Sequence, residues 1–106
     1  MTIKDVGRIV LSGFSLEPAE KAILDNLIKN YKNKIAEKIG FKEISLRLRK
    51  SQHGKAFLHE VQGRMLAGKS FNAKVTDYNL FAAVSEVLEK LMHEAEHKLR
   101  TKRQIK

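Results

Sequence analysis

The chain has 106 residues, 42% of them hydrophobic and 31% charged, which predicts one small folded domain with a single hydrophobic core. It contains no cysteine, which excludes disulfides and thiolate metal sites, and no apolar run of about 18 residues, so we expect no membrane-spanning helix. The 21 Lys and Arg residues against 12 Asp and Glu residues give a net charge of +9. This excess favours a polyanionic partner, with nucleic acid ahead of an anionic membrane; the alternative is a protein that is merely rich in lysine. The N-terminus lacks the pattern of a signal peptide, so we expect a cytoplasmic protein.

The N-terminal part of the chain is predicted to form a strand and then a helix. Arg8 to Phe14 is an apolar run of strand length. Glu17 and Pro18 are expected to open the helix, because proline suits the first helical turn. Gly40 is expected to end it in a left-handed conformation. Helical spacing predicts one buried side made of Leu24, Leu27, Ile28, Tyr31, Ile35 and Ile39.

Three more strands are predicted before the second helix. Residues 41–50 alternate, with one side formed by Ile44, Leu46 and Leu48 and a basic side that includes Arg47 and Arg49. Residues 50–55 are expected to form a turn in which Gly54 adopts a positive φ. The third strand is predicted from Ala56 to Met65. Its apolar residues occur at both odd and even positions, which suggests a bulge at Gly63. A second turn is expected at residues 66–69, and a fourth strand over residues 71–75.

The last predicted element is a long amphipathic helix. Asp77 is the expected N-cap. The buried side is predicted to be formed by Leu80, Val84, Val87, Leu88, Leu91, Ala95 and Leu99, and the tail over residues 101–106 is expected to be frayed. The order β-α-β-β-β-α predicts an α+β two-layer sandwich over residues 1–106, with a four-stranded sheet and two helices on one face, as in double-stranded RNA-binding domains. The first helix either crosses over between two neighbouring parallel strands or returns to the far edge of the sheet.

Residues 63–70 (GRMLAGKS) match the phosphate-binding pattern G-x-x-x-x-G-K-[ST]. That motif works at the start of a helix, where backbone N–H groups surround the phosphates. The residues that follow here alternate as in a strand, and no apolar strand ending in Asp is placed to hold magnesium. We therefore interpret this segment as a β-hairpin turn that uses Gly68.

Residues 93–97 (HEAEH) match the zinc-protease pattern H-E-x-x-H. A catalytic zinc site needs a third protein ligand, and none of the nine residues after His97 is His, Asp or Glu. We interpret His93 and His97 as exposed residues on a basic helix that could bind zinc or nickel adventitiously. No nucleophile–base arrangement is recognisable either. The sequence therefore predicts no catalytic residues, no resident metal, no cofactor and no small-molecule substrate, and the protein is not expected to be an enzyme.

The predicted element order, with the segment DYNLFAAVSEVLEKL after the fourth strand, resembles the ribosome hibernation-promoting factors, also called ribosome-associated inhibitor A proteins. The most specific stretch runs from Ala73 to Leu91. There the family has a short strand, a polar turn and an aromatic-Ala-Ala-Ile type helix start, matched by residues 81–84 (FAAV), and then an acidic-Lys-Leu triplet, matched by residues 89–91 (EKL). The resemblance extends loosely over nearly the whole chain and corresponds to the short form, which lacks a dimerisation domain.

The resemblance implies binding to the small ribosomal subunit, in the channel for mRNA and tRNA anticodons, by a monomer that blocks initiation. Family contacts come from basic residues on exposed helix surfaces: Lys90 stands where the family has Lys, and His93 where it often has Arg. Glu94 and Glu96 depart from the family pattern. The implied rRNA-binding residues are Lys29, Lys32, Lys90, His93, Lys98, Arg100, Lys102 and Arg103. A second candidate basic face on the sheet consists of Arg47, Arg49 and Lys50.

Two other functions fit parts of the pattern. A double-stranded RNA-binding module has a similar order of elements, but it carries a lysine-rich start of the last helix, and residues 77–88 contain no Lys or Arg. A protein-interaction scaffold could use the free face of the sheet. Weak dependence of binding on salt would favour the scaffold.

Overall fold

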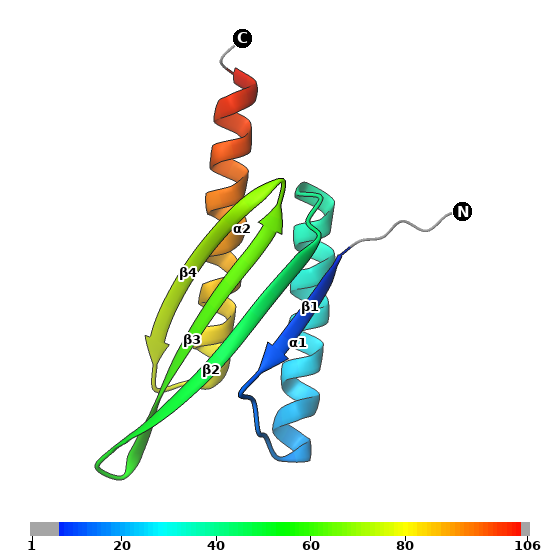
Figure 1. Cartoon of the computed structure of the whole chain (residues 1–106). Helices are drawn as coiled ribbons and strands as arrows, with labels where there is room; N and C mark the ends of the chain where they lie inside the picture. Colours follow the sequence, from blue (N-terminus) through cyan, green and yellow to red (C-terminus); the bar gives the residue numbers. More distant parts are fainter. Residues whose placement is uncertain (1–6, 105–106) are drawn as a thin grey trace.

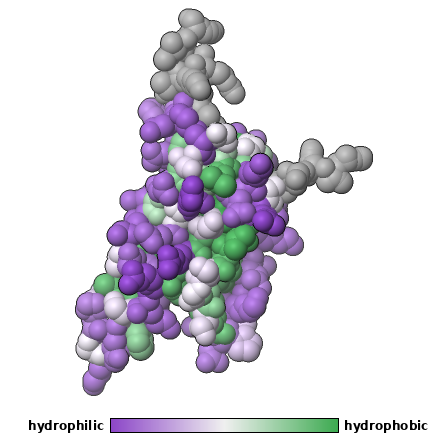
Figure 2. Space-filling model, in the orientation of Figure 1, coloured by the Kyte–Doolittle hydropathy of each residue, from purple (hydrophilic) through white to green (hydrophobic). Residues whose placement is uncertain are grey.

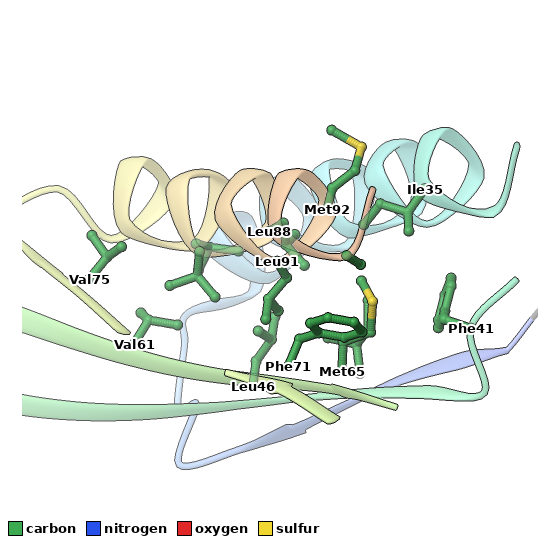
Figure 3. Packing of buried hydrophobic residues seen from close by; sticks show 14 of the residues in the cluster. Ile35, Phe41, Leu46, Val61, Met65, Phe71, Val75, Leu88, Leu91 and Met92 are labelled. Carbon is green, nitrogen blue, oxygen red and sulfur yellow. The ribbon is translucent and has the colours of Figure 1, made fainter. Parts of the chain in front are cut away.

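The computed structural model describes residues 7–104, with side chains as far as Lys98. Its elements are β1 (Arg8–Ser12), α1 (Pro18–Lys38), β2 (Glu43–His53), β3 (Ala56–Ala67), β4 (Lys69–Asp77) and α2 (Leu80–Gln104). The strands form one sheet in the order β1-β2-β3-β4, in which β1 and β2 are parallel and the other neighbours antiparallel. Both helices cover the same face (Figures 1 and 3). The predicted two-layer α+β fold is therefore confirmed, with α1 crossing between neighbouring parallel strands.

Helix α1 begins as predicted and ends differently. Pro18 stands in its first turn, and the backbone N–H of Glu17 donates to Oε1 of Glu20 at 3.2 Å. At the other end, Ile39 is extended, with a φ of −137°. Gly40 is not among the glycines with a positive φ, so the predicted left-handed cap is wrong. The helix ends because Ile39 itself is extended, and its buried side chain joins the core.

The core lies between the sheet and the helices, and α2 supplies much of it (Figure 3). The alternation of β2 is as predicted, with Ile44, Leu46 and Leu48 all buried. The predicted bulge at Gly63 is wrong, because Gly63 pairs with Leu46 and Ala73 in two unbroken ladders. A Cβ atom at this position would lie 2.5 Å from Cγ1 of Val87 in α2. The glycine therefore permits the close approach of α2 to the sheet.

Both hairpin turns are tighter than predicted. Strand β2 continues to His53, and the turn shrinks to residues 54 and 55, with Gly54 at the expected positive φ of 66°. Strand β3 continues to Ala67 and β4 starts at Lys69, so the second turn is a bend at Gly68 with a φ of 83°. Ladder hydrogen bonds extend into segments whose polar composition resembles a loop.

The predicted cap of the second helix is wrong. Asp77 ends β4, and Asn79 caps α2, because its Oδ1 accepts the backbone N–H of Ala82 at 3.0 Å. Oδ1 of Asp77 instead accepts the N–H of Asn79 at 2.8 Å. The predicted buried side is confirmed as far as Ala95, and the side chain of Leu99 lies outside the described part. The fraying of the tail stays a prediction, since α2 includes residues up to Gln104 and residues 105–106 are not described.

Candidate nucleic-acid interface

The face of the sheet opposite the helices is polar and basic. Side chains of alternate residues point to this face, among them Arg47 of β2, Arg64 of β3 and Lys74 of β4, and all three are exposed. Figure 2 shows hydrophilic residues over β3 and β4, while hydrophobic residues gather near β1, where Val10 is 41% exposed. A shallow hollow of about 560 Å³ lies on the basic part, lined in the main by Ser45, Arg47, Gln62, Arg64, Asn72 and Lys74.

A second hollow, of about 590 Å³, lies between β4 and α2. Asn72 and Lys74 line both hollows, so the two join across β4, which is an edge strand of the sheet. The side chains contributed by α2 are those of Lys90, His93, Glu94, His97 and Lys98. We call the continuous area formed by Arg47, Arg64, Lys74, Lys90 and Lys98 the basic surface.

The five cations of the basic surface are weakly engaged within the chain. Lys74 pairs with Glu60 at 3.3 Å, and Lys98 with Glu94 at 3.5 Å. Arg64 donates to the hydroxyl of Ser70 at 3.3 Å. Within the described residues, Arg47 and Lys90 have no ion pair or hydrogen bond. Because exposed ion pairs contribute only about 0–1 kcal/mol, an incoming phosphate can replace these carboxylates at little cost.

The carboxylate of Glu89 lies beside the basic surface, where α1 meets α2, and three side chains contact it. The hydroxyl of Tyr31 donates to Oε2 of Glu89 at 2.7 Å, and Nζ of Lys34 donates to the same oxygen at 3.3 Å. Nε2 of His93 lies 3.5 Å from Oε1 of Glu89. The hydrogen bond from Tyr31 lowers the pKa of Glu89, with Lys34 acting in the same direction. Glu89 therefore stays ionised beside His93, which also lines the hollow beside α2.

The structure separates the predicted rRNA-binding residues into groups. Lys90, His93 and Lys98 lie together beside β4. Lys29 and Lys32 do not join them: Lys34 of α1 contacts α2, and Lys29, five residues earlier, points about 140° away around the helix. Three predicted residues stand on the backbone of α2 in the part whose side chains are not described: Arg100, Lys102 and Arg103.

The second candidate face is also divided. Arg47 belongs to the basic surface and Arg49 follows it on the same side of β2. Lys50 points to the opposite side, where its Nζ lies 5.2 Å from the ring centroid of Phe57. Sequence reasoning missed Arg64 and Lys74. In the alternating pattern of β3 and β4 both residues fall on the side opposite the apolar residues, which could have identified them. Arg64, however, lies within the string that resembles a phosphate-binding loop.

The two enzyme-like strings lie on ordinary secondary structure. Gly63 to Ser70 runs from β3 through the bend at Gly68 into β4, which confirms the interpretation as a hairpin turn. His93 and His97 are exposed on α2, as expected. Among the residues that the structure describes, no three His, Cys, Asp or Glu side chains are grouped so as to hold a metal ion. Nor is any helix in the described part long and apolar enough to cross a membrane.

No protein-family model matches the chain, and no curated protein matches it. Among solved structures, the fold is similar to that in the crystal structure of the N-terminal domain of Protein Y from Thermus thermophilus, with a TM-score of 0.53 and 13% sequence identity. The match covers 89% of this chain and 98% of that domain. At this identity the likeness concerns the fold.

Proposed function

We propose that the protein binds the small ribosomal subunit through the basic surface, occupies the channel for mRNA and tRNA anticodons, and thereby inhibits translation in idle ribosomes. The observation that carries this proposal is the continuity of the basic surface from the open sheet across β4 to α2. The fold shared with the Protein Y domain supports the hibernation-promoting family, which the sequence resembles, at the level of the fold.

The basic surface suits recognition of a folded RNA by its backbone. Its cations come from three strands and one helix, so they can contact phosphates that are brought together by RNA tertiary structure. Such contacts give affinity without reading sequence, because each neutralised phosphate releases counterions. The proposed role needs no catalysis and no cofactor, a single copy of the chain can perform it, and it would take place in the cytoplasm.

Specific observations disfavour the other two functions. The first turns of α2, from Leu80 to Leu88, carry no basic residue, whereas a double-stranded RNA-binding module depends on that region. The open face of the sheet carries three exposed cations of the basic surface, so it is a poor match for an apolar protein platform.

Sedimentation of the purified protein with small ribosomal subunits through sucrose gradients tests the proposal. If about five phosphates are neutralised, log affinity falls against log salt with a slope of roughly −3.5 to −4.5. Raising the salt from about 50 to 200 mM should then weaken binding about 100- to 500-fold. Absence from the subunit fractions at every salt concentration would overturn the proposal.

Charge reversal identifies the surface that binds. The double variant Arg47→Glu/Lys90→Glu should lose co-sedimentation, while the matched variant Lys29→Glu/Lys32→Glu should keep it. Within the described residues none of the four side chains has an ion pair, so both variants should fold normally, which circular dichroism checks. The opposite result would move the interface to the exposed side of α1.

A further inference from the structure

The hairpin of β2 and β3 extends beyond the rest of the sheet. Strand β1 pairs with β2 only from Glu43 to Arg47, and β4 pairs with β3 only from His59 onward. Residues 50–59 therefore pair with one another and, apart from the pairing of His59 with Asp77, with no other strand; they form the projecting end of the green strands in Figure 1. We call this two-stranded segment the arm. A two-stranded hairpin is at best marginally stable alone, and the arm adds no buried side chain to the core.

The arm is basic and uncovered. Between Arg49 and His59 the sequence has three Lys or Arg residues, two His residues and no Asp or Glu. Every residue from Arg49 to Phe57 is exposed. The excess of positive charge therefore continues to the tip of the hairpin, beyond the basic surface, and it attracts a polyanion.

Phe57 gives the arm an aromatic platform. Its side chain is 46% exposed although phenylalanine favours the core. Lys50 pairs with His59 and Gln52 with Phe57, so Lys50 and Phe57 lie on the same side of the hairpin. Nζ of Lys50 lies over the Phe57 ring, 5.2 Å from its centroid, and this cation–π contact keeps the positive charge close to the ring. An exposed ring flanked by cations is the arrangement on which unpaired bases stack, with their phosphates bound alongside.

We infer that the arm binds single-stranded RNA, with one unpaired base stacked on Phe57 and the adjacent phosphates held by Lys50 and Lys55. Double-stranded RNA does not fit, because its bases are stacked on each other and cannot reach the ring. The inference deepens the proposed function and rests on it, since the small subunit would supply the RNA.

Two substitutions of Phe57 separate stacking from charge. Phe57→Leu removes the aromatic face but keeps an apolar side chain, whereas Phe57→Tyr keeps the ring. The probes are a fluorescein-labelled 12-nucleotide oligouridylate, a blunt RNA duplex of the same length, and small ribosomal subunits. Phe57→Leu should weaken binding to the single strand and to the subunit roughly 5- to 150-fold, with the salt slope unchanged. Phe57→Tyr should bind as the parent protein does.

The lysines are tested by the salt slope. Lys50→Ala/Lys55→Ala should reduce the slope with the oligouridylate by about 1.4, because two phosphate contacts are lost. The affinity for the duplex should be the same for the parent protein, Phe57→Leu and Phe57→Tyr. Since Phe57 is exposed, thermal melts of all variants should coincide with that of the parent protein.

The outcomes separate this inference from the proposed function. Subunit binding that is equal for Phe57→Leu and Phe57→Tyr overturns the role of the arm and leaves the proposed function standing. No subunit binding, but oligouridylate binding that needs Phe57, overturns the proposed function and retains the arm as an RNA-binding element. Equal binding of both variants to all RNA probes, together with a Phe57-dependent protein partner that survives ribonuclease treatment, overturns the inference.

Discussion

The hydroxyl of Tyr31 in α1 donates a 2.7 Å hydrogen bond to Oε2 of Glu89 in α2, and this bond ties the two helices together. Lys34 adds a 3.3 Å contact to the same carboxylate oxygen. Glu89 belongs to the acidic-Lys-Leu triplet that supports the family resemblance, and the next residue, Lys90, belongs to the basic surface. The helix pairing thus fixes the orientation of the part of α2 that faces β4.

Replacing Tyr31 by Phe should destabilise the fold. The variant loses a hydrogen bond to a charged, half-buried acceptor, and such bonds contribute about 1.5–3 kcal/mol. We expect a loss near the lower end of that range, because water can reach Glu89, whose side chain is 32% exposed. Urea denaturation followed by circular dichroism measures the change. Tyr78→Phe is the matched control: Tyr78 is 58% exposed, so its variant should unfold at the parental urea concentration.

Tyr31 should also titrate abnormally. Burial raises its pKa to about 12, and the hydrogen bond and negative charge of Glu89 act in the same direction. A raised pKa means that the folded state favours the protonated phenol. The stability it contributes is therefore complete below the ordinary value of about 10 and is lost as the pH rises through the folded value. Ultraviolet titration of the Tyr78→Phe variant, in which Tyr31 is the sole tyrosine, should give a midpoint about 2 units above that of free tyrosine.

Glu89→Gln in the same background tests the cause. Removing the negative charge should move the Tyr31 midpoint downward, but not fully to the ordinary value, since burial is the largest contribution. A midpoint that does not respond to Glu89→Gln would contradict the coupling between the helices. Far-ultraviolet circular dichroism at each pH confirms that the titration reports the folded state.

Asn79→Ala should weaken the start of α2. The side chain of Asn79 accepts the N–H of Ala82, and losing such a cap costs about 1 kcal/mol. Asn79→Asp is the control, because aspartate can accept the same bond and adds a favourable charge at the helix N-terminus. Thermal unfolding should therefore rank Asn79→Ala below the parent protein and Asn79→Asp at or above it. An unchanged melting temperature for Asn79→Ala would show that tertiary packing alone holds this end of the helix.

The sequence predicts what depends on local periodicity. The alternation around Leu46 and the helical spacing around Leu88 predicted a strand and a helix, because each buried side is determined within one element. The misplaced cap of α2 has a cause that lies outside the helix. Asp77 and Asn79 are both good capping residues, and the length of the β4 ladder decides between them.

The candidate site depends on pairing between elements, which periodicity does not report. Arg64 and Lys74 become neighbours of Arg47 only through the registers of β2 with β3 and of β3 with β4. In the same way, the orientation of α1 carries Lys29 away from Lys90, although both stand on exposed helix surfaces. Charge counts therefore predicted a basic protein, but not which cations lie together.

Gly63 provides the last prediction, because its role is packing and not phosphate binding. A Cβ at position 63 would lie 2.5 Å from Cγ1 of Val87, 2.9 Å from Cδ1 of Leu91 and 3.2 Å from Cδ2 of Leu46. Overpacking of this kind costs about 1–3 kcal/mol, so Gly63→Ala should lower the free energy of unfolding by about that much, which urea denaturation measures. Gly40→Ala is the control, since no atom of the described residues lies within 4 Å of a Cβ at that position, and its urea midpoint should equal or exceed the parental one.

A double-variant cycle identifies the clash. Val87→Ala alone should destabilise the core by leaving a cavity, but in the Gly63→Ala background it removes the atom nearest to the new methyl group. The double variant should therefore be more stable than the sum of the two single changes predicts, as expected for residues in contact. Strict additivity would mean that α2 moves away from β3 as a unit. In that case Gly63→Ala would also alter the hollow between β4 and α2 and weaken subunit binding without removing any charge.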